Sequence, residues 1–215
     1  MDATRIIAVR HGETAWNVDT RLQGHLDIEL NDRGQWQVRR LAQALAHEPI
    51  AAVYSSDLAR AWQTAQAIAG SHGLQVHPEP RLRERAFGHF EGRTFLDIQR
   101  ELPEQAERWR RRDPDFAPAG GGESLLQFRA RVTEAVAELA ARHPAELVVL
   151  VAHGGVMDLL YRAATGQELQ APRTWQLGNA HINRMLWTGQ ALTLVGWADD
   201  THLGGDDALD EQAAA

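Results

Sequence analysis

Two stretches of this chain, TRIIAVRHG at residues 4–12 and ELVVLVAHGG at residues 146–155, decide the fold. Each is a short, continuously apolar run, rich in β-branched residues, that ends at a His-Gly pair. Runs of this kind are typical of strands that are buried on both faces of a parallel sheet. The chain is therefore predicted to be an α/β protein in which His11 and His153 follow directly after two strands.

Four further short runs extend this sheet to about six strands. They are residues 51–54, 74–77, 181–187 and 191–197. The last two flank Thr188-Gly189-Gln190, which predicts an antiparallel hairpin. Since helical patterns lie between the other strands, we expect a three-layer α/β/α sandwich on a mostly parallel sheet, with this hairpin at one edge.

The helices between the strands are predicted from apolar residues three and four positions apart. Asn31 is a candidate N-cap before the first helix, and Ser124 with Gln127 forms a capping box before the last. The periodic apolar residues are Val38, Leu41, Ala42 and Leu45; Leu58, Ala61, Trp62, Ala65 and Ile68; and Leu125, Phe128, Val132, Val136 and Leu139.

A single domain is expected to occupy residues 1–198 of the 215-residue chain. Residues 85–122 are rich in Arg, Pro and Gly with little sustained periodicity, which indicates a lid-like insertion over one end of the sheet. Residues 199–215 contain six acidic residues and no arginine, so we expect a disordered acidic tail. The rest of the chain has 23 acidic and 22 basic residues and is nearly neutral.

The composition excludes several kinds of chemistry. The chain has no cysteine and all 22 basic residues are arginine, which rules out disulfides, thiolate nucleophiles, lysine Schiff bases and phosphate-loop lysines. The longest apolar run, Leu147–Ala152, is far shorter than the roughly 18 residues of a membrane-spanning helix. The first apolar run, Ile6–Val9, is too short for a secretory signal, so we expect a cytoplasmic protein without membrane contact.

An arginine cluster in the insertion allows two interpretations. Arg108, Arg110, Arg111 and Arg112 alternate with acidic residues at three- and four-residue spacing, which is typical of a solvated helix face with ion pairs. Alternatively, the cluster belongs to a lid that supplies positive charge to an anionic substrate. The nearly neutral body and the lack of an aromatic-basic platform give no support for nucleic-acid binding.

We expect the ligand site at the carboxyl ends of the two strands that precede His11 and His153, because loops and helix N-termini converge there in open α/β sheets. If the two strands are neighbours, His11 and His153 lie side by side at about the 4.8 Å spacing of strands. The glycine after each histidine lets an oxyanion approach main-chain N–H groups, and Arg10 adds positive charge. A buried histidine pair that serves only packing is the alternative.

Six ordered motifs are spread over residues 5–160. They are Arg10-His11-Gly12-Glu13-Thr14 with Trp16-Asn17; Gln23-Gly24; Ser55-Ser56-Asp57-Leu58-Ala59-Arg60-Ala61 with Gln63-Thr64-Ala65; Leu82-Arg83-Glu84 before Phe87-Gly88; Glu91-Gly92; and Ala152-His153-Gly154. With these motifs the sequence resembles the histidine phosphatase superfamily, and more narrowly its phosphoglycerate mutase-like branch of cofactor-dependent phosphoglycerate mutases and related small phosphatases. The resemblance implies the same α/β sandwich as the strand and helix patterns.

The resemblance also implies catalytic roles. His11 would be the nucleophile that carries the phosphoryl group, and Glu84 would be the general acid and base. Arg10, Arg60 and a protonated His153 would form a clamp around the transferring group. No metal ion and no cofactor is implied, because fixed positive charge takes the place of a metal.

The remaining site residues would bind rather than react. Asn17 and the backbone around Gln23 and Gly24 would add hydrogen bonds to phosphate or substrate, and Gly154 would let the phosphate approach the main chain. Glu13 would orient the arginines from behind, because a carboxylate beside the phosphate would repel it.

Two reactions are compatible with this site, hydrolysis and transfer within the substrate, since the phosphohistidine can be attacked by water or by a hydroxyl of the substrate. The mutases that the sequence resembles carry a longer insertion with a lysine, whereas here only 69 positions separate Glu84 from His153 and there is no lysine. We therefore favour a metal-independent phosphomonoester hydrolase that acts through phosphohistidine on a small phosphorylated metabolite. Glu84-Arg85 and the arginine cluster favour the alternative, a cofactor-dependent phosphoglycerate mutase.

Two further alternatives are a catalytically weak phospho-ligand binding module and a metal-dependent hydrolase. The first would lack the nucleophile or the acid, and both are present. The second would need a third metal ligand beside His11 and Glu13. The natural substrate is set by residues 85–122, which contain no readable motif. The oligomeric state is open, with a homodimer as one option.

Overall fold

The computed structural model describes residues 2–204, which form one six-stranded sheet with the strand order β3-β2-β4-β1-β5-β6. Neighbours among β1 to β4 pair in parallel, whereas β5 runs antiparallel to β1 and β6 antiparallel to β5. This confirms the predicted fold class, including the edge hairpin. The strands are β1 (Thr4–Arg10), β2 (Ile50–Ser55), β3 (Val76–Pro78), β4 (Leu147–Ala152), β5 (Ile182–Trp187) and β6 (Leu192–Asp199).

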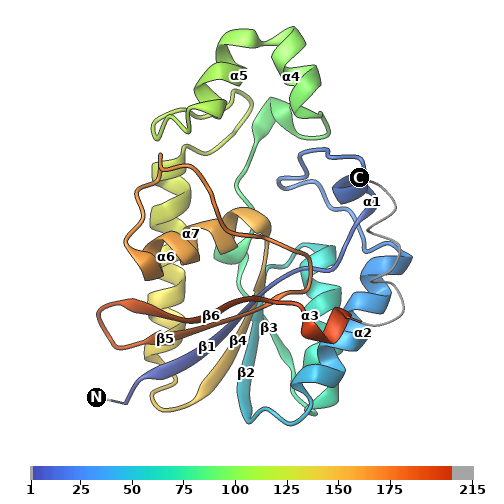
Figure 1. Ribbon diagram of the computed structural model, residues 1–215, viewed down its shortest axis with the longest axis vertical. Coiled ribbons are helices and arrows are strands. Elements are labelled where there is room, and N and C mark those ends of the chain that lie inside the picture. Colours follow the sequence, from blue (N-terminus) through green and yellow to red (C-terminus); the bar gives the residue numbers. More distant parts are fainter. Residues whose placement is uncertain (1, 205–215) are drawn as a thin grey trace.

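Helices cover both faces of this sheet (Figure 1). On one face, α2 (Asp32–Leu45) and α3 (Ala59–Ser71) pack on Ile7 and Val9 of β1; on the other, α6 (Leu125–Ala141) and α7 (Gly154–Thr165) pack on Ile6 and Ala8. Alternate side chains of one buried strand therefore enter two different cores, which is why its sequence is apolar throughout. None of the helices in residues 2–204 is long and apolar enough to cross a membrane.

The predicted helix starts match the observed caps. The Asn31 side chain accepts a hydrogen bond from the Gly34 N–H at the start of α2. At the start of α6, Ser124 and Gln127 form the expected reciprocal capping box. Short helical segments complete the fold: α1 (Ala15–Val18), η1 (Pro80–Leu82) and η3 (Thr201–Leu203).

Residues 85–122, the cap from here on, stand beyond the carboxyl ends of the strands (Figure 1). The cap contains η2 (Gly88–Phe90), α4 (Phe95–Glu101) and α5 (Pro103–Arg110). These helices are too short to show sustained periodicity in the sequence. The cap has a small hydrophobic cluster of its own, formed by Phe87, Phe90, Ile98, Ala106 and Phe116.

The predicted domain boundary at residue 198 was placed too early. β6 extends to Asp199, and Asp199 accepts hydrogen bonds from the N–H and hydroxyl of Thr201 at the start of η3. His202 ties this turn to the domain, because its carbonyl accepts from Arg40 Nε at 2.9 Å. The first acidic residues of the supposed tail therefore organise a turn. The remainder of that tail, residues 205–215, lies outside the described residues.

Candidate active site

The two histidines lie side by side because β1 and β4 are neighbours. Arg10 is in register with Ala152, and the residue that directly follows each of these two strand ends is a histidine. The main-chain N–H of His11 donates to the Ala152 carbonyl at 3.0 Å, and the two imidazole centroids are 5.2 Å apart. The condition left open by the sequence, that the two strands are adjacent, is met.

His11 is held in one tautomer by its own backbone. Its Nδ1 lies 2.7 Å from the Gly12 carbonyl oxygen, which can only accept, so Nδ1 carries the proton of the neutral ring. The lone pair is then on Nε2. Asn179 donates from Nδ2 to the His11 carbonyl at 2.9 Å, and the Gly12 N–H donates to the Thr64 hydroxyl at 3.1 Å. The backbone on both sides of the imidazole is thereby fixed.

His153 is buried at the N-terminus of α7, where it is the residue before the first helical turn. Its Nε2 lies 2.8 Å from the Ser56 hydroxyl, and Ser56 follows directly after β2. Three neighbouring strand ends thus supply the two imidazoles and the hydroxyl that positions one of them.

Arg60 lies in the first turn of α3 and is only 1% exposed. Its two terminal nitrogens donate to the carbonyls of Leu26 and Gly24, each at 2.8 Å. Gly24 has φ +53°, and a Cβ there would lie 2.1 Å from the Glu91 carboxylate. A glycine is therefore required for the turn that fixes this arginine.

Arg10 packs against the start of α7. A terminal nitrogen of its guanidinium donates to the Leu177 carbonyl, and a Cβ on Gly154 would already be in contact with its Nε at 3.4 Å. Gly154 therefore lies against Arg10 as well as beside His153.

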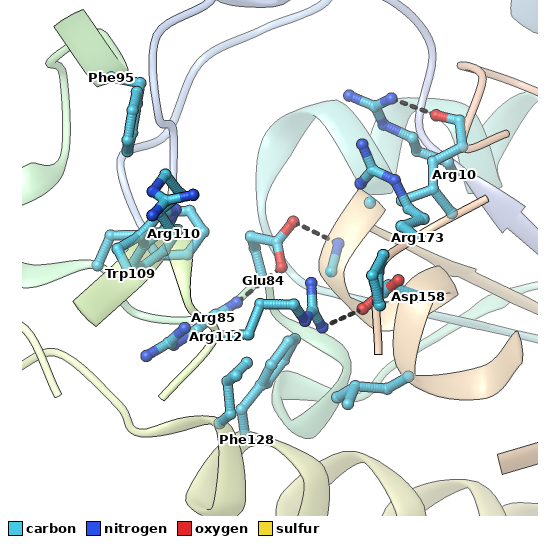
Figure 2. A pocket seen from close by; sticks show the side chains of 17 residues that line it. Arg10, Glu84, Arg85, Phe95, Trp109, Arg110, Arg112, Phe128, Asp158 and Arg173 are labelled. Atoms are coloured by element: carbon cyan, nitrogen blue, oxygen red, sulfur yellow. Dashed lines mark hydrogen bonds and ion pairs between the residues drawn. The ribbon is translucent and has the colours of Figure 1, made fainter. Parts of the chain in front are cut away.

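Glu84 points its carboxylate at the same helix N-terminus (Figure 2). Its two oxygens accept from the main-chain N–H groups of Gly155 and Arg85, at 2.9 and 2.8 Å. A Cβ on Gly155 would lie 2.2 Å from the carboxylate, so this approach also depends on a glycine. The Glu84 carbonyl accepts from His25 Nε2 at 2.9 Å, which anchors the loop from behind.

Buried polar atoms without partners gather at this site. In residues 2–204, nine buried side-chain nitrogen or oxygen atoms have no hydrogen-bond partner. Four of them belong to predicted site residues: Arg10 Nε, Arg60 Nε, His153 Nδ1 and Gln23 Oε1. Each such atom costs about 1–3 kcal/mol if it stays unpaired. Three of the four are nitrogens of cationic or titratable side chains, which suits an anionic ligand.

The electrostatics of the site also favour an anion. Burial, followed by the charges of Arg60 and Arg10, holds the pKa of His11 well below its usual value. Burial and Arg60 lower the pKa of His153 in the same way. Burial also lowers the pKa of Arg60 to about 10. The expectation that a protonated His153 completes the clamp concerns the complex with a phosphoryl group and stays a prediction.

The predicted binding residues surround the same place. Asn17 Oδ1 accepts from the main chain of Thr14 at 3.0 Å and lies 3.3 Å from Asn179 Nδ2, so the group it offers a phosphate is its own Nδ2. Gly24 contributes its carbonyl to Arg60 rather than to a ligand. Glu13 was expected to orient the site arginines; its carboxylate accepts from Asn31 Nδ2 at 2.8 Å, and its charge acts on Arg10.

Comparison with known proteins agrees with this geometry. The family model of the histidine phosphatase superfamily (branch 1) matches residues 6–200. This chain belongs to that superfamily. It is 39% identical over 206 residues to phosphoglycerate mutase-like protein 4 of Arabidopsis thaliana, which covers 94% of this chain and 88% of the relative. It is 36% identical to the metal-independent phosphoserine phosphatase of the same plant, over 94% of this chain and 84% of the relative.

A solved structure agrees as well. Mycobacterial glucosyl-3-phosphoglycerate phosphatase superposes with a TM-score of 0.80 at 34% identity, covering 92% of this chain and all of the other. The chain is thus an enzyme of the histidine phosphatase superfamily, as the motifs predicted. No group of three or more His, Cys, Asp or Glu side chains in its described part is arranged to hold a metal ion.

A cavity of about 750 Å³ opens beside the pair formed by His11 and His153. Arg10, Glu84, Gly154 and Gly155 form its inner end, and the cap supplies much of the rest, including Trp109. This volume lies within the usual range for small-ligand sites.

Most of the arginine cluster in the cap is engaged with acids. Arg110 and Arg111 bind Glu107, and Arg108 binds Asp113 at 2.7 Å, as expected for a solvated face with ion pairs. The last arginine of the cluster departs from this pattern, because Arg112 Nη2 reaches α7 and donates to the Asp158 carboxylate at 2.7 Å. The cluster therefore serves mainly structure, and one member ties the cap to the domain.

Sequence reasoning missed several residues of the site. Ser56 stands inside a quoted motif, but nothing in the sequence indicated that it would contact His153. Gly155 closes the quoted stretch over residues 146–155 but was given no role there. Asn179 and Asp158 belong to no motif, and each is positioned by a contact between distant parts of the chain. No signal in a single sequence could have identified them.

Proposed function

We propose that this enzyme hydrolyses a phosphomonoester of a small metabolite through a phosphohistidine on His11. The observation that carries the proposal is the hydrogen bond from His11 Nδ1 to the Gly12 carbonyl, which leaves the lone pair on Nε2. The unpartnered nitrogens of Arg10, Arg60 and His153 lie around it. The names of the relatives, which include phosphoserine and glucosyl-3-phosphoglycerate phosphatases, support a small phosphorylated substrate.

In the first step, His11 Nε2 attacks phosphorus and the bond from phosphorus to the ester oxygen breaks. Arg10 and Arg60 hold the non-bridging oxygens, where negative charge is spread in the transition state. Protonated Glu84 gives its proton to the departing oxygen, so an alcohol leaves. The proton on His11 Nδ1 stays there throughout, in its hydrogen bond to the Gly12 carbonyl oxygen.

In the second step, water attacks the phosphorus and the bond to His11 Nε2 breaks. Glu84, now a carboxylate, takes a proton from that water and is ready for the next cycle. Gly155 and Arg85 hold the Glu84 carboxylate in place through main-chain N–H groups. Inorganic phosphate leaves and His11 is again neutral.

Release of phosphate from p-nitrophenyl phosphate tests this function, with and without EDTA. We expect turnover that EDTA does not reduce, because the positive charge comes from arginine. Interconversion of 2- and 3-phosphoglycerate in the presence of bisphosphoglycerate, with little phosphate released, would instead establish the mutase alternative. Binding without either reaction would establish a phospho-ligand binding module. A cytoplasmic location and a homodimer stay predictions, to be tested by cell fractionation and by light scattering.

A further inference from the structure

One arginine at the cavity, Arg173, has no part in the mechanism above. It lies in the segment between α7 and β5, is exposed, and lines the cavity together with Arg10 and Glu84. Burial lowers the pKa of Arg10, and the charges of Glu84 and Arg173 also act on it, so Arg173 is close enough to interact with Arg10. Figure 2 shows Arg10 and Arg173 on the same side of Glu84, with Trp109 on the other.

The other arginines that line the outer cavity are engaged with protein groups. Arg85 donates to two main-chain carbonyls, at 2.8 and 2.7 Å. Arg110 binds both carboxylate oxygens of a glutamate in its own helix, and Arg112 binds Asp158. Within residues 2–204, the guanidinium of Arg173 has neither a hydrogen-bond nor an ion-pair partner.

A bound phosphoryl group leaves the charge of Arg173 without a counter-ion. Five arginines line the cavity with two acids, Glu84 and Asp158, and Glu107 from outside the lining offsets Arg110. Arg112 is paired with Asp158, and Arg10 together with the nearby Arg60 balances a phosphomonoester dianion. A single guanidinium presents a planar fork that matches one carboxylate, whereas a second phosphate would call for more than one free cation.

We propose that the substrate carries a carboxylate on the carbon chain of its phosphoester, and that Arg173 binds this carboxylate. The inference rests on the proposed phosphatase function and adds the substrate class to it. The phosphoryl group lies at Arg10 and His11 and the carboxylate at Arg173, with the carbon chain of the substrate between them. Arg173 is then a residue that determines specificity and takes no part in the bond-breaking steps.

A matched pair of esters tests this assignment. 3-Phosphoglycerate and glycerol 3-phosphate differ only in a carboxylate that replaces a hydroxymethyl group. We expect the wild-type enzyme to prefer 3-phosphoglycerate in kcat/KM for phosphate release. Arg173→Gln should lower that value about tenfold, the effect of one partly exposed charged hydrogen bond, and change the value for glycerol 3-phosphate less than twofold. Arg110→Gln is the matched control, since Arg110 lines the cavity but is engaged with Glu107; it should leave the ratio of the two values unchanged.

The outcomes separate the two proposals. If the wild-type enzyme hydrolyses p-nitrophenyl phosphate but shows no preference between the two esters, the role of Arg173 is overturned and the phosphatase function stands. Equal loss on both esters in Arg173→Gln, or no loss on either, overturns it as well. If none of the three compounds releases phosphate, the proposed function itself fails.

Discussion

The strand-end site and the cap treat their charged side chains in opposite ways. At the strand ends, Arg60 and His153 are buried and Arg10 is half-buried, and each keeps a buried nitrogen without a partner. In the cap, Arg108, Arg110 and Arg111 are exposed and bound to acids of the cap itself. Unpaired buried donors are costly and persist where a ligand completes them, whereas paired surface ions contribute little beyond local order. Under the proposed function, the side chains that bind substrate are those with an unpartnered buried nitrogen. The arginines with acidic partners stabilise the structure of the cap.

The largest effect is expected from replacing Glu84, the proposed general acid of the strand-end site. Glu84→Gln keeps an oxygen for the Gly155 N–H but has no proton to exchange, so kcat should fall by about 10² to 10⁴. With p-nitrophenyl phosphate the leaving group needs little protonation, so the second step should limit the rate. Rapid mixing should then show a burst of p-nitrophenolate equal to the enzyme concentration. Unchanged turnover without a burst would assign the acid to another residue.

The next effect tests whether the buried arginine acts through its shape as well as its charge. Arg60→Lys keeps one positive charge but loses the two-pronged donor, so kcat should fall by about 10² to 10³. The control is Arg100→Lys on α4, where the side chain is 72% exposed and paired within the cap; its kcat should stay within about twofold. Equal kcat values for the two variants would contradict the comparison. Thermal melting of both variants checks that they fold.

A smaller effect concerns the one arginine of the cap cluster that reaches the domain. Asp158 Oδ2 binds both Arg112, at 2.7 Å, and Arg162, at 3.0 Å, and the Arg162 side chain is 2% exposed. Asp158→Asn leaves that buried cation without a counter-ion and should cost about 3 kcal/mol of unfolding free energy. Arg112→Met leaves the Asp158–Arg162 pair intact and should cost about 1 kcal/mol. Urea unfolding measures both values. The reverse order would show that the cap, and not the buried pair, depends most on this contact.

The smallest effect is a dependence of stability on pH. Burial holds the pKa values of His11 and His153 well below normal in the folded state, whereas the same side chains in the unfolded chain have a pKa of about 6.5. Below that pH the unfolded state binds more protons, so unfolding free energy should fall as pH drops from 7.5 to 5.5. The limit is about 1.4 kcal/mol per pH unit for each histidine. Inorganic phosphate should reduce this slope, because its charge favours the protonated rings. A stability that is flat over this range would contradict the burial of the pair among cations.

The sequence predicted the placement of His11 beside His153 because the strands themselves fix both residues. The predicted strand over residues 4–10 coincides with β1, and the register of β1 with β4 then brings His11 beside His153. A short continuous apolar run that is rich in β-branched residues and ends before a glycine favours a strand buried on both faces over a buried helix segment.

The cap was predicted only as an insertion, since α4 and α5 have seven and eight residues and give too few turns for a pattern. Its tie to the domain, between Arg112 and Asp158, joins positions 46 apart that no local rule connects. The burial of His153 among distant arginines was not predicted for the same kind of reason, because it is a property of the folded chain alone. The same holds for the turn at residues 199–204, which was assigned to the tail.

The measurement that tests the central claim most directly is to trap the phosphoenzyme. The enzyme is quenched in base during turnover of p-nitrophenyl phosphate, and the phosphoryl group is located by mass spectrometry and by its acid lability. The bond from His11 Nδ1 to the Gly12 carbonyl predicts a single phosphoryl group on His11 Nε2, stable in base, lost in acid and absent from His11→Ala. A phosphoryl group on Nδ1, or one that persists in His11→Ala, would contradict the account.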